Sequence, residues 1–309
     1  MTQHTITTGL PLLNKILVPL DDSTNSEEVL RFVIKIAAPN PHAQITLFTI
    51  ANLDSPGEAT SVLRLESFVA LLASEGIKSN FAITESMHIP SSIVEWANEH
   101  DFEMVAMSTR GQGTLSSAIL GSVSFGVLRQ SLIPVMALAA GMINRHRLDK
   151  STLSEIVVPL DGSYLSESCL PYAEVLAKSL GLDIRLVNVM PATVNTLDYD
   201  YMYGHTSYAI SEKDTQTEHR GSREYLSYTT EKLRDRGVNV SSQNLPNGDI
   251  TRSLINCVSN PSQSLFVMTT HNRSGLEGLL NRSVAKSVIG NYGGPVFTVP
   301  APTTEGASK

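Results

Sequence analysis

The sequence contains little cysteine, no long apolar run and no excess of positive charge. Its 309 residues include two cysteines, Cys169 and Cys257, without metal-ligand spacing, so we expect reduced thiols in the core of a cytoplasmic protein. It has neither a run of roughly eighteen apolar residues nor a start typical of a signal peptide, so membrane insertion and export are not expected. The formal net charge of −7 argues against nucleic acid as a partner, because nucleic-acid-binding proteins usually present a basic face.

Three motifs that mark enzyme active sites are also missing from the sequence. It contains no Gly-x-x-x-x-Gly-Lys-Ser/Thr phosphate loop, no Gly-x-Ser-x-Gly nucleophile elbow and no His-Glu-x-x-His zinc motif. No catalytic base for attack on a phosphate can be identified either. We therefore expect a protein that is not an enzyme, or one that hydrolyses a nucleotide slowly at most.

Apolar segments alternate between the spacing of strands and the spacing of helices. Residues 15–20 predict a strand that ends at Asp21, and Thr24 with Glu27 fits a capping box for the helix that follows. The same alternation continues to residue 138 and predicts an α/β fold with a parallel sheet. The further strands expected are 44–50, 77–84, 102–107 and 134–138, and the further helices are 62–74, one that starts near Pro90, and 122–130.

The second half of the chain repeats the first. Residues 155–163 repeat the first strand and its Asp turn at an offset of 140 residues, and later landmarks recur at an offset of 161. The difference predicts an insertion of 21 residues at about 191–221, which either covers a crevice or is a surface excursion. We expect domains at 11–141 and 155–301, joined by a linker at 142–154. The later landmarks are Gly76 with Gly237, Ile93 with Leu254, Ser122 with Ser283, and Pro134 with Pro295.

A glycine-rich stretch, residues 108–123, joins an expected strand to an expected helix. Glycine at positions 111, 113 and 121 is expected to permit positive φ and close approach of the backbone to a ligand. A helix that starts near Ser122 offers unpaired N–H groups to an anion, and the Arg110 side chain adds charged donors. The stretch is therefore either a phosphate-binding loop or a structural turn.

These residues resemble the universal stress protein family, in its tandem form with two such domains in one chain. The resemblance rests on Val-Pro-Leu-Asp at 18–21 and 158–161, Met-Ser-Thr-Arg-Gly at 107–111, and Gly-Ser-Val at 121–123. It implies two doubly wound, Rossmann-like five-stranded parallel sheets, each with a ligand crevice at the carboxyl ends of its first and fourth strands. It also implies that the last strands of the two domains, 134–138 and 295–299, pair with each other as in the dimers of the family.

ATP-binding members of this family carry Gly-x-x-Gly, nine residues, and then Gly-Ser or Gly-Thr. Ser108 replaces the first glycine here, whereas Gly111 and Gly121-Ser122 match. Asp21 matches a partner of the adenine or ribose end, caps its own turn, or does both. The residues that the resemblance assigns to the nucleotide are Pro19, Leu20, Asp21, Ile50, Met107, Ser108, Arg110, Gly111, Gly121, Ser122 and Val123.

The second repeat departs further from the nucleotide-binding pattern. Thr269, Asn272 and Arg282 occupy its three glycine positions, so we expect a weak or empty site, unless Arg273 and Arg282 form an altered anion site. The resemblance implies a stress-response regulator that binds ATP or a related adenine nucleotide, with or without Mg²⁺, in its first domain. It further implies an unidentified protein partner and association of two chains. The alternative is a nucleotide-free adaptor that acts through protein contacts.

Overall fold

The fold is described from a computed structural model. It describes residues 10–21, 23–51, 58–109, 120–139, 153–189, 212–246, 248–270 and 284–302. For residues 24–27, 58–61 and 212–220 it describes the backbone alone.

The first repeat is a five-stranded parallel sheet with strand order β3-β2-β1-β4-β5. Three consecutive residues of β1, Ile16, Leu17 and Val18, are fully buried because helices cover both faces of the sheet. Every element expected from the sequence is present, with ends that shift by a few residues. The elements are β1 (Lys15–Pro19), α1 (Thr24–Ala37), β2 (Gln44–Ala51), α2 (Glu58–Ser74), β3 (Lys78–Glu85), α3 (Ile89–Glu99), β4 (Met104–Ser108), α4 (Ser122–Gln130) and β5 (Val135–Leu138).

The second repeat has the same strand order, with two changes in its helices. Its first helix is broken into α5 and α6, where α1 is continuous, and α8 has 23 residues where its counterpart α2 has 17. Residues 190–211, which hold most of the expected insertion, lie outside the described part of the chain. The elements are β6 (Glu155–Pro159), α5 (Tyr164–Glu167), α6 (Leu170–Leu180), β7 (Asp183–Val189), α8 (Glu212–Arg234), β8 (Val240–Leu245), α9 (Ile250–Asn256), β9 (Ser264–Thr270), α10 (Val284–Asn291) and β10 (Val296–Pro300).

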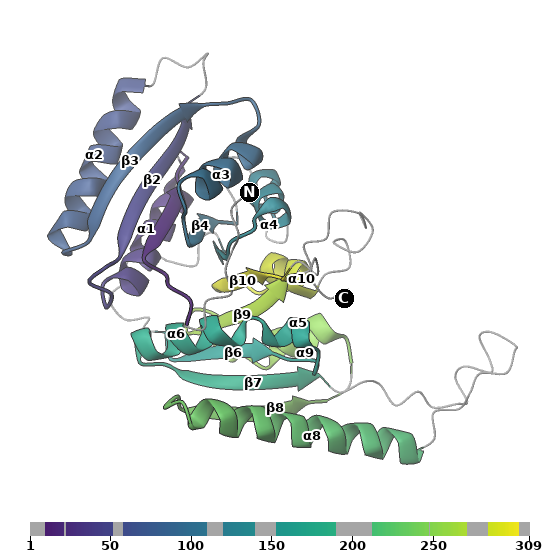
Figure 1. The fold of residues 1–309 in the computed structure, drawn as a ribbon. Helices are drawn as coiled ribbons and strands as arrows, with labels where there is room; N and C mark the ends of the chain where they lie inside the picture. The colour runs from purple at the N-terminus through teal and green to yellow at the C-terminus, as the bar shows by residue number, and fades with distance from the viewer. Residues whose placement is uncertain are drawn as a thin grey trace, which may run out of the picture.

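The two repeats join through β5 and β10, which pair antiparallel as expected, so that one ten-stranded sheet runs through the molecule (Figure 1). At the centre of this seam Met136 pairs with Phe297, its own counterpart at the offset of 161. The Thr298 hydroxyl donates a buried hydrogen bond of 3.0 Å to the Val135 carbonyl across the seam. Because the seam is antiparallel, the carboxyl ends of β1 and β4 lie at one edge of the sheet, and those of β6 and β9 at the opposite edge.

Helices form one layer on each face of this sheet. Helices α1, α2, α6 and α8 share a single apolar core that crosses the seam. On the other face, α3 with α4 and α9 with α10 cover two separate cores. Helices α3 and α4 approach closely at Gly126, where a Cβ atom would lie 2.6 Å from the Pro90 Cβ.

Several helices end at a residue with positive φ. Gly76 after α2 and Gly237 after α8 have φ of 74° and 81°, while the non-glycine residue Asp101 after α3 has φ of 52°. In each case the next N–H group bonds back into the helix, as in Phe102 N–H to the Ala97 carbonyl at 2.9 Å. Asp101 therefore terminates α3 in the left-handed conformation that glycine adopts after α2 and α8.

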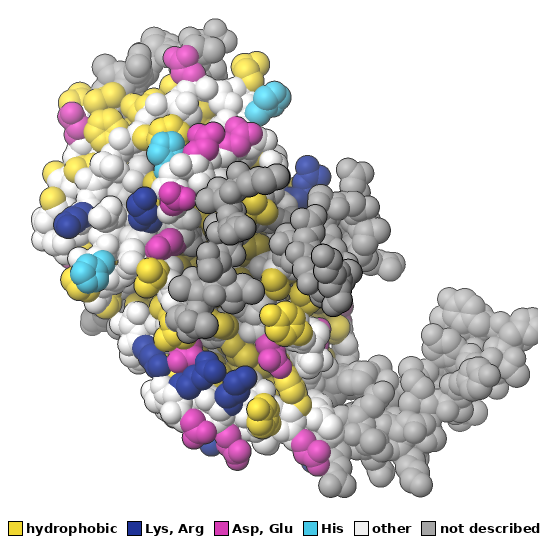
Figure 2. Space-filling view, in the orientation of Figure 1, with side chains coloured by type: hydrophobic (Ala, Val, Ile, Leu, Met, Phe, Trp, Pro, Cys, Tyr) yellow, Lys and Arg dark blue, Asp and Glu magenta, His cyan; other side chains and the backbone are white. Residues whose placement is uncertain are grey.

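Acidic and basic side chains are interspersed over both repeats on the face drawn in Figure 2. Among the described residues, we find no helix with the length and hydropathy that crossing a membrane requires.

Candidate functional site

The end of β1 is hydrogen-bonded to β2, and the chain then turns into α1. The Leu20 N–H donates to the Phe48 carbonyl at 2.8 Å, and the Thr49 hydroxyl donates to the Leu20 carbonyl at 3.3 Å. The Asp21 Oδ1 atom accepts from the N–H of Ser23 at 3.1 Å and from its hydroxyl. Of the two roles that the sequence suggested for Asp21, capping its own turn is therefore observed.

The end of β4 lies beside this turn, because β4 pairs with β1. The Thr109 N–H donates to the Leu138 carbonyl of β5 at 2.7 Å, and the Thr109 carbonyl accepts from the Gly121 N–H at 2.8 Å. The chain thus leaves the sheet at Thr109 and returns to the same point at Gly121. Arg110 and Gly111, both predicted ligand residues, lie outside the described part of the chain.

Helix α4 begins at Ser122 with Gly121 as its N-cap residue. Gly121 does not use the positive φ that glycine permits: with φ of −62° and ψ of 151° it takes the extended conformation of an N-cap. Glycine has no side chain with which to cap the helix, and no other capping side chain is found among the described residues. Its first N–H groups, together with the positive end of the helix dipole, can therefore serve an anion.

The other predicted site residues lie at the strand ends or in the core. Pro19 ends β1 and Ser108 ends β4, with its carbonyl 2.8 Å from the donating hydroxyl of Ser124, whereas Leu20 follows β1 and its side chain is buried in the core that α1 shares. Three further predicted residues contribute side chains to the apolar core under α3 and α4. These are Ile50, Met107 and Val123.

The second repeat fills the equivalent region with its own side chains. Helix α5 lies against the end of β9, where the Ser168 and Thr269 hydroxyls are 3.1 Å apart. The Cys169 thiol is fully buried and donates to the Ser166 carbonyl at 3.2 Å, and burial raises its pKa to about 12. Cys169 is thus an inert core residue, as expected. The residues at positions 271–283, Arg282 among them, lie outside the described ranges.

Asp161 repeats the geometry of Asp21, with its Oδ1 accepting from the Ser163 N–H at 2.9 Å. Burial alone would raise the pKa of Asp161, but hydrogen bonds from Ser163 and Ser166 outweigh burial and hold that pKa below its ordinary value. The Asp turn is therefore an element of structure in both repeats.

Two residues near the first crevice were not identified from the sequence. Arg64 of α2 donates to the Asp21 and Ser23 carbonyls, and the buried Ser124 of α4 holds the end of β4. At the offset of 161 their counterparts are Tyr225 and Ala285, which cannot make these bonds in the same way. A comparison of the repeats position by position shows only that both residues differ between them.

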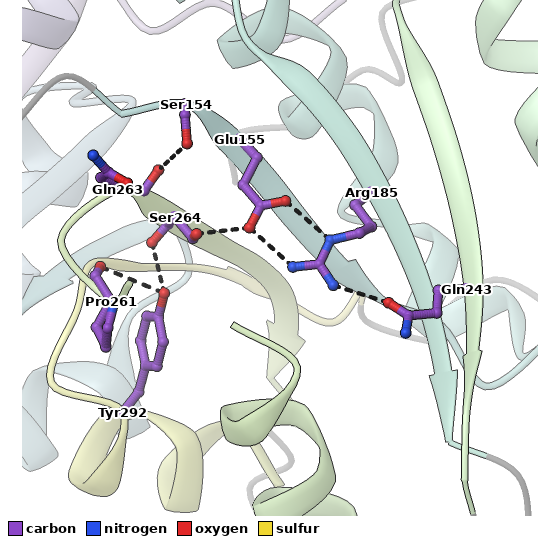
Figure 3. Close-up of polar contacts among 8 residues, drawn as sticks. All are labelled: Ser154, Glu155, Arg185, Gln243, Pro261, Gln263, Ser264 and Tyr292. Carbon is purple, nitrogen blue, oxygen red and sulfur yellow. Dashed lines mark hydrogen bonds and ion pairs between the residues drawn. The ribbon is translucent and has the colours of Figure 1, made fainter. Parts of the chain in front are cut away.

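A second polar cluster lies at the amino ends of β6 and β9 (Figure 3). The Arg185 guanidinium donates two hydrogen bonds of 2.9 Å to the Glu155 carboxylate, which also accepts from the Ser264 hydroxyl at 2.7 Å. Burial raises the pKa of Glu155, but the bonds from Arg185 and Ser264 hold it below its ordinary value. The charges are satisfied within the cluster, so its role is structural. No group of three potential metal ligands occurs among the described residues.

Comparison with solved structures finds the same architecture over the whole chain. A universal stress protein from Archaeoglobus fulgidus is 19% identical with a TM-score of 0.70, over 93% of this chain and 98% of that chain. A functionally unknown protein from Pseudomonas aeruginosa is 16% identical with a TM-score of 0.65, over 94% and 93%. At these identities the similarity shows the fold. No curated protein matches the sequence.

A single-domain universal stress protein from Archaeoglobus fulgidus, solved in complex with dAMP, is 22% identical over 40% of this chain and 96% of that chain, with a TM-score of 0.32. The model of the universal stress protein family matches this sequence twice, over residues 13–139 and 153–300. Two family matches and two copies of one fold, joined through β5 and β10, lead to one conclusion. The chain belongs to the universal stress protein family, in the tandem form with two such domains.

Proposed function

We propose that the first repeat binds ATP or a related adenine nucleotide at the carboxyl ends of β1 and β4. The observation that carries the proposal is the start of α4, which has a glycine N-cap, no capping side chain from the described residues, and a position where the chain returns to the end of β4. Backbone N–H groups in this arrangement bind phosphate without a dedicated cationic pocket. The Ser122 hydroxyl, exposed at the same helix start, supplies a further donor.

The opposite end of the proposed site is the turn after β1. A carboxylate can accept about four hydrogen bonds, so the capping role of Asp21 does not conflict with a bond from a ribose hydroxyl. The Pro19, Leu20 and Ile50 backbone lies at the ends of β1 and β2, beside the switch point of the strand order, where open α/β sheets bind their ligands. Any Mg²⁺ would come with the phosphates, which supply the oxygen ligands that this ion prefers.

The second repeat is proposed to be degenerate. Its hydroxyl groups at the end of β9 already contact α5, and its sequence has arginine at the position of Gly121. We propose that nucleotide binding at the first repeat is read by a protein partner in the cytoplasm. The nucleotide would then act as a signal and not as a substrate.

The test is to identify adenine compounds released from the purified protein and to titrate stripped protein with ATP by calorimetry. We expect one ATP per chain, and loss of binding in Gly121→Arg, which gives the first repeat the residue that the second carries. The unfolding midpoint of the variant should stay unchanged. Two ATP per chain would refute the degenerate second site, and in that case Arg282→Gly should have little effect. No binding at millimolar ATP would refute nucleotide binding and favour the nucleotide-free adaptor.

A further inference from the structure

Arg64 lies on the second turn of α2, beside the turn that follows β1. Its Nη1 donates to the Asp21 carbonyl at 3.0 Å and its Nη2 donates to the Ser23 carbonyl at 3.3 Å. One guanidinium thus spans the main chain on both sides of residue 22. The planar fork of arginine suits two acceptors held at fixed separation, and a lysine could not reproduce both bonds at once.

The guanidinium is itself held in place. Its Cζ lies 5.5 Å from the centre of the Phe68 ring, one turn further along α2. Phe68 in turn packs against the apolar core shared by α1 and α2. A cation on an aromatic face is attracted by the negative potential of the ring. The position of Arg64 is therefore tied to the core and not only to the turn.

The turn has a second anchor, which both repeats share. Thr49 donates to the Leu20 carbonyl at 3.3 Å, and in the second repeat Asn188 donates to the Leu160 carbonyl at 2.7 Å. The Arg64 anchor is different, because its counterpart is Tyr225. Tyr225 offers a single hydroxyl in place of the guanidinium, and burial first, then the Glu167 carboxylate, raise the pKa of that hydroxyl. The duplication thus separates an anchor common to the fold from one found in the first repeat alone.

We propose that Arg64 is a positioning residue of the first repeat, which holds the Asp21 carboxylate in the orientation that receives the ligand. The proposal rests on the proposed nucleotide site. Arg64 acts through the main chain, because its two bonds fix the carbonyls of Asp21 and Ser23. The fixed main chain holds the Ser23 N–H in place, and this N–H donates to Asp21 Oδ1. A preorganised turn does not have to be ordered when the ligand binds, so affinity rises.

The test compares Arg64→Met, which keeps an apolar stem over Phe68 but no donors, with Arg64→Lys. The control is Arg223→Met, which removes the same charge from an exposed position on α8. We expect Arg64→Met to bind ATP about tenfold more weakly, which corresponds to about 1.4 kcal/mol. Arg64→Lys should recover part of the loss and Arg223→Met should bind like wild type. Arg64→Met should unfold at a lower midpoint, because it loses both bonds to the turn and the cation over Phe68. ATP affinity is therefore measured at a temperature where every variant is folded, and a merely structural role would lower the midpoint and leave that affinity unchanged.

A second measurement separates failure of this proposal from failure of the nucleotide site. In the absence of nucleotide, hydrogen exchange at the Ser23 amide should be faster in Arg64→Met than in wild type and Arg223→Met. Unchanged exchange together with unchanged ATP affinity would overturn the positioning role. If wild type binds no ATP, faster exchange at the Ser23 amide in Arg64→Met would still show that Arg64 anchors the turn. The proposal that this anchor serves nucleotide binding would then be refuted.

Discussion

Gly126 and Gly221 provide a direct test of how closely α3 and α4 pack. Both lie inside helices, α4 and α8, where replacing glycine by alanine alone contributes about 1 kcal/mol of stability. At Gly221 a Cβ atom would meet nothing within 4 Å, whereas at Gly126 it would lie 2.6 and 2.7 Å from two carbons of Pro90. Overpacking of this kind costs about 1–3 kcal/mol. We therefore expect Gly221→Ala to be stabilised by about 1 kcal/mol and Gly126→Ala to be destabilised by up to about 2 kcal/mol.

The measurement is urea unfolding of wild type and both variants, followed by circular dichroism at several protein concentrations. In thermal unfolding of the same proteins, the midpoint of Gly221→Ala should rise and that of Gly126→Ala should fall, by about 2–4 °C for each kcal/mol. If Gly126→Ala were stabilised as much as Gly221→Ala, α3 would be free to move away from α4. The close approach would then not be a constraint on this face of the first repeat, and the reasoning would be refuted.

Three further predictions concern single residues. Asp101→Gly should raise the free energy of unfolding by about 0.5–1 kcal/mol, since glycine relieves a positive φ, and an unchanged value in urea unfolding would contradict this. Thr298→Val removes the buried hydroxyl that bonds across the seam and should cost about 1–2 kcal/mol, whereas no loss would show that the seam does not need that bond. Arg185→Met should destabilise the chain more at pH 7 than at low pH. The folded pKa of Glu155 is lowered, so the ion pair contributes stability above the unfolded pKa and loses it as pH falls through the folded value, and a pH-independent difference would refute this.

The order of elements could be predicted because it depends on local pattern. Helix α4 begins at Ser122 and ends at Gln130 as expected, since a glycine N-cap and apolar spacing mark it. The β5–β10 seam followed from the family resemblance. The ends of strands were less certain: β4 starts two residues later than expected, because Phe102 completes the hydrogen-bonded end of α3 at Asp101.

The candidate site was predicted less completely, because several of its features depend on contacts distant in sequence. Arg64 bonds to carbonyls 41 and 43 residues away, and nothing in its local sequence distinguishes it from a solvated arginine. The contact between the Ser168 and Thr269 hydroxyls at the end of α5 likewise joins residues far apart in the chain. The φ of Gly121 could not be predicted, because a glycine N-cap and a left-handed glycine look the same in sequence.

The side chains at the β5–β10 seam also determine which repeats can associate with each other. Lys286 of α10 lies 4.3 Å from the centre of the Phe125 ring of α4, and these two residues are counterparts at the offset of 161, as are Met136 and Phe297. Two copies of the first repeat would oppose phenylalanine to phenylalanine here, and two copies of the second would oppose lysine to lysine, at a cost in charge repulsion. Fusion of the repeats into one chain has therefore allowed the interface to become heterotypic, with a cation on one half and its aromatic acceptor on the other.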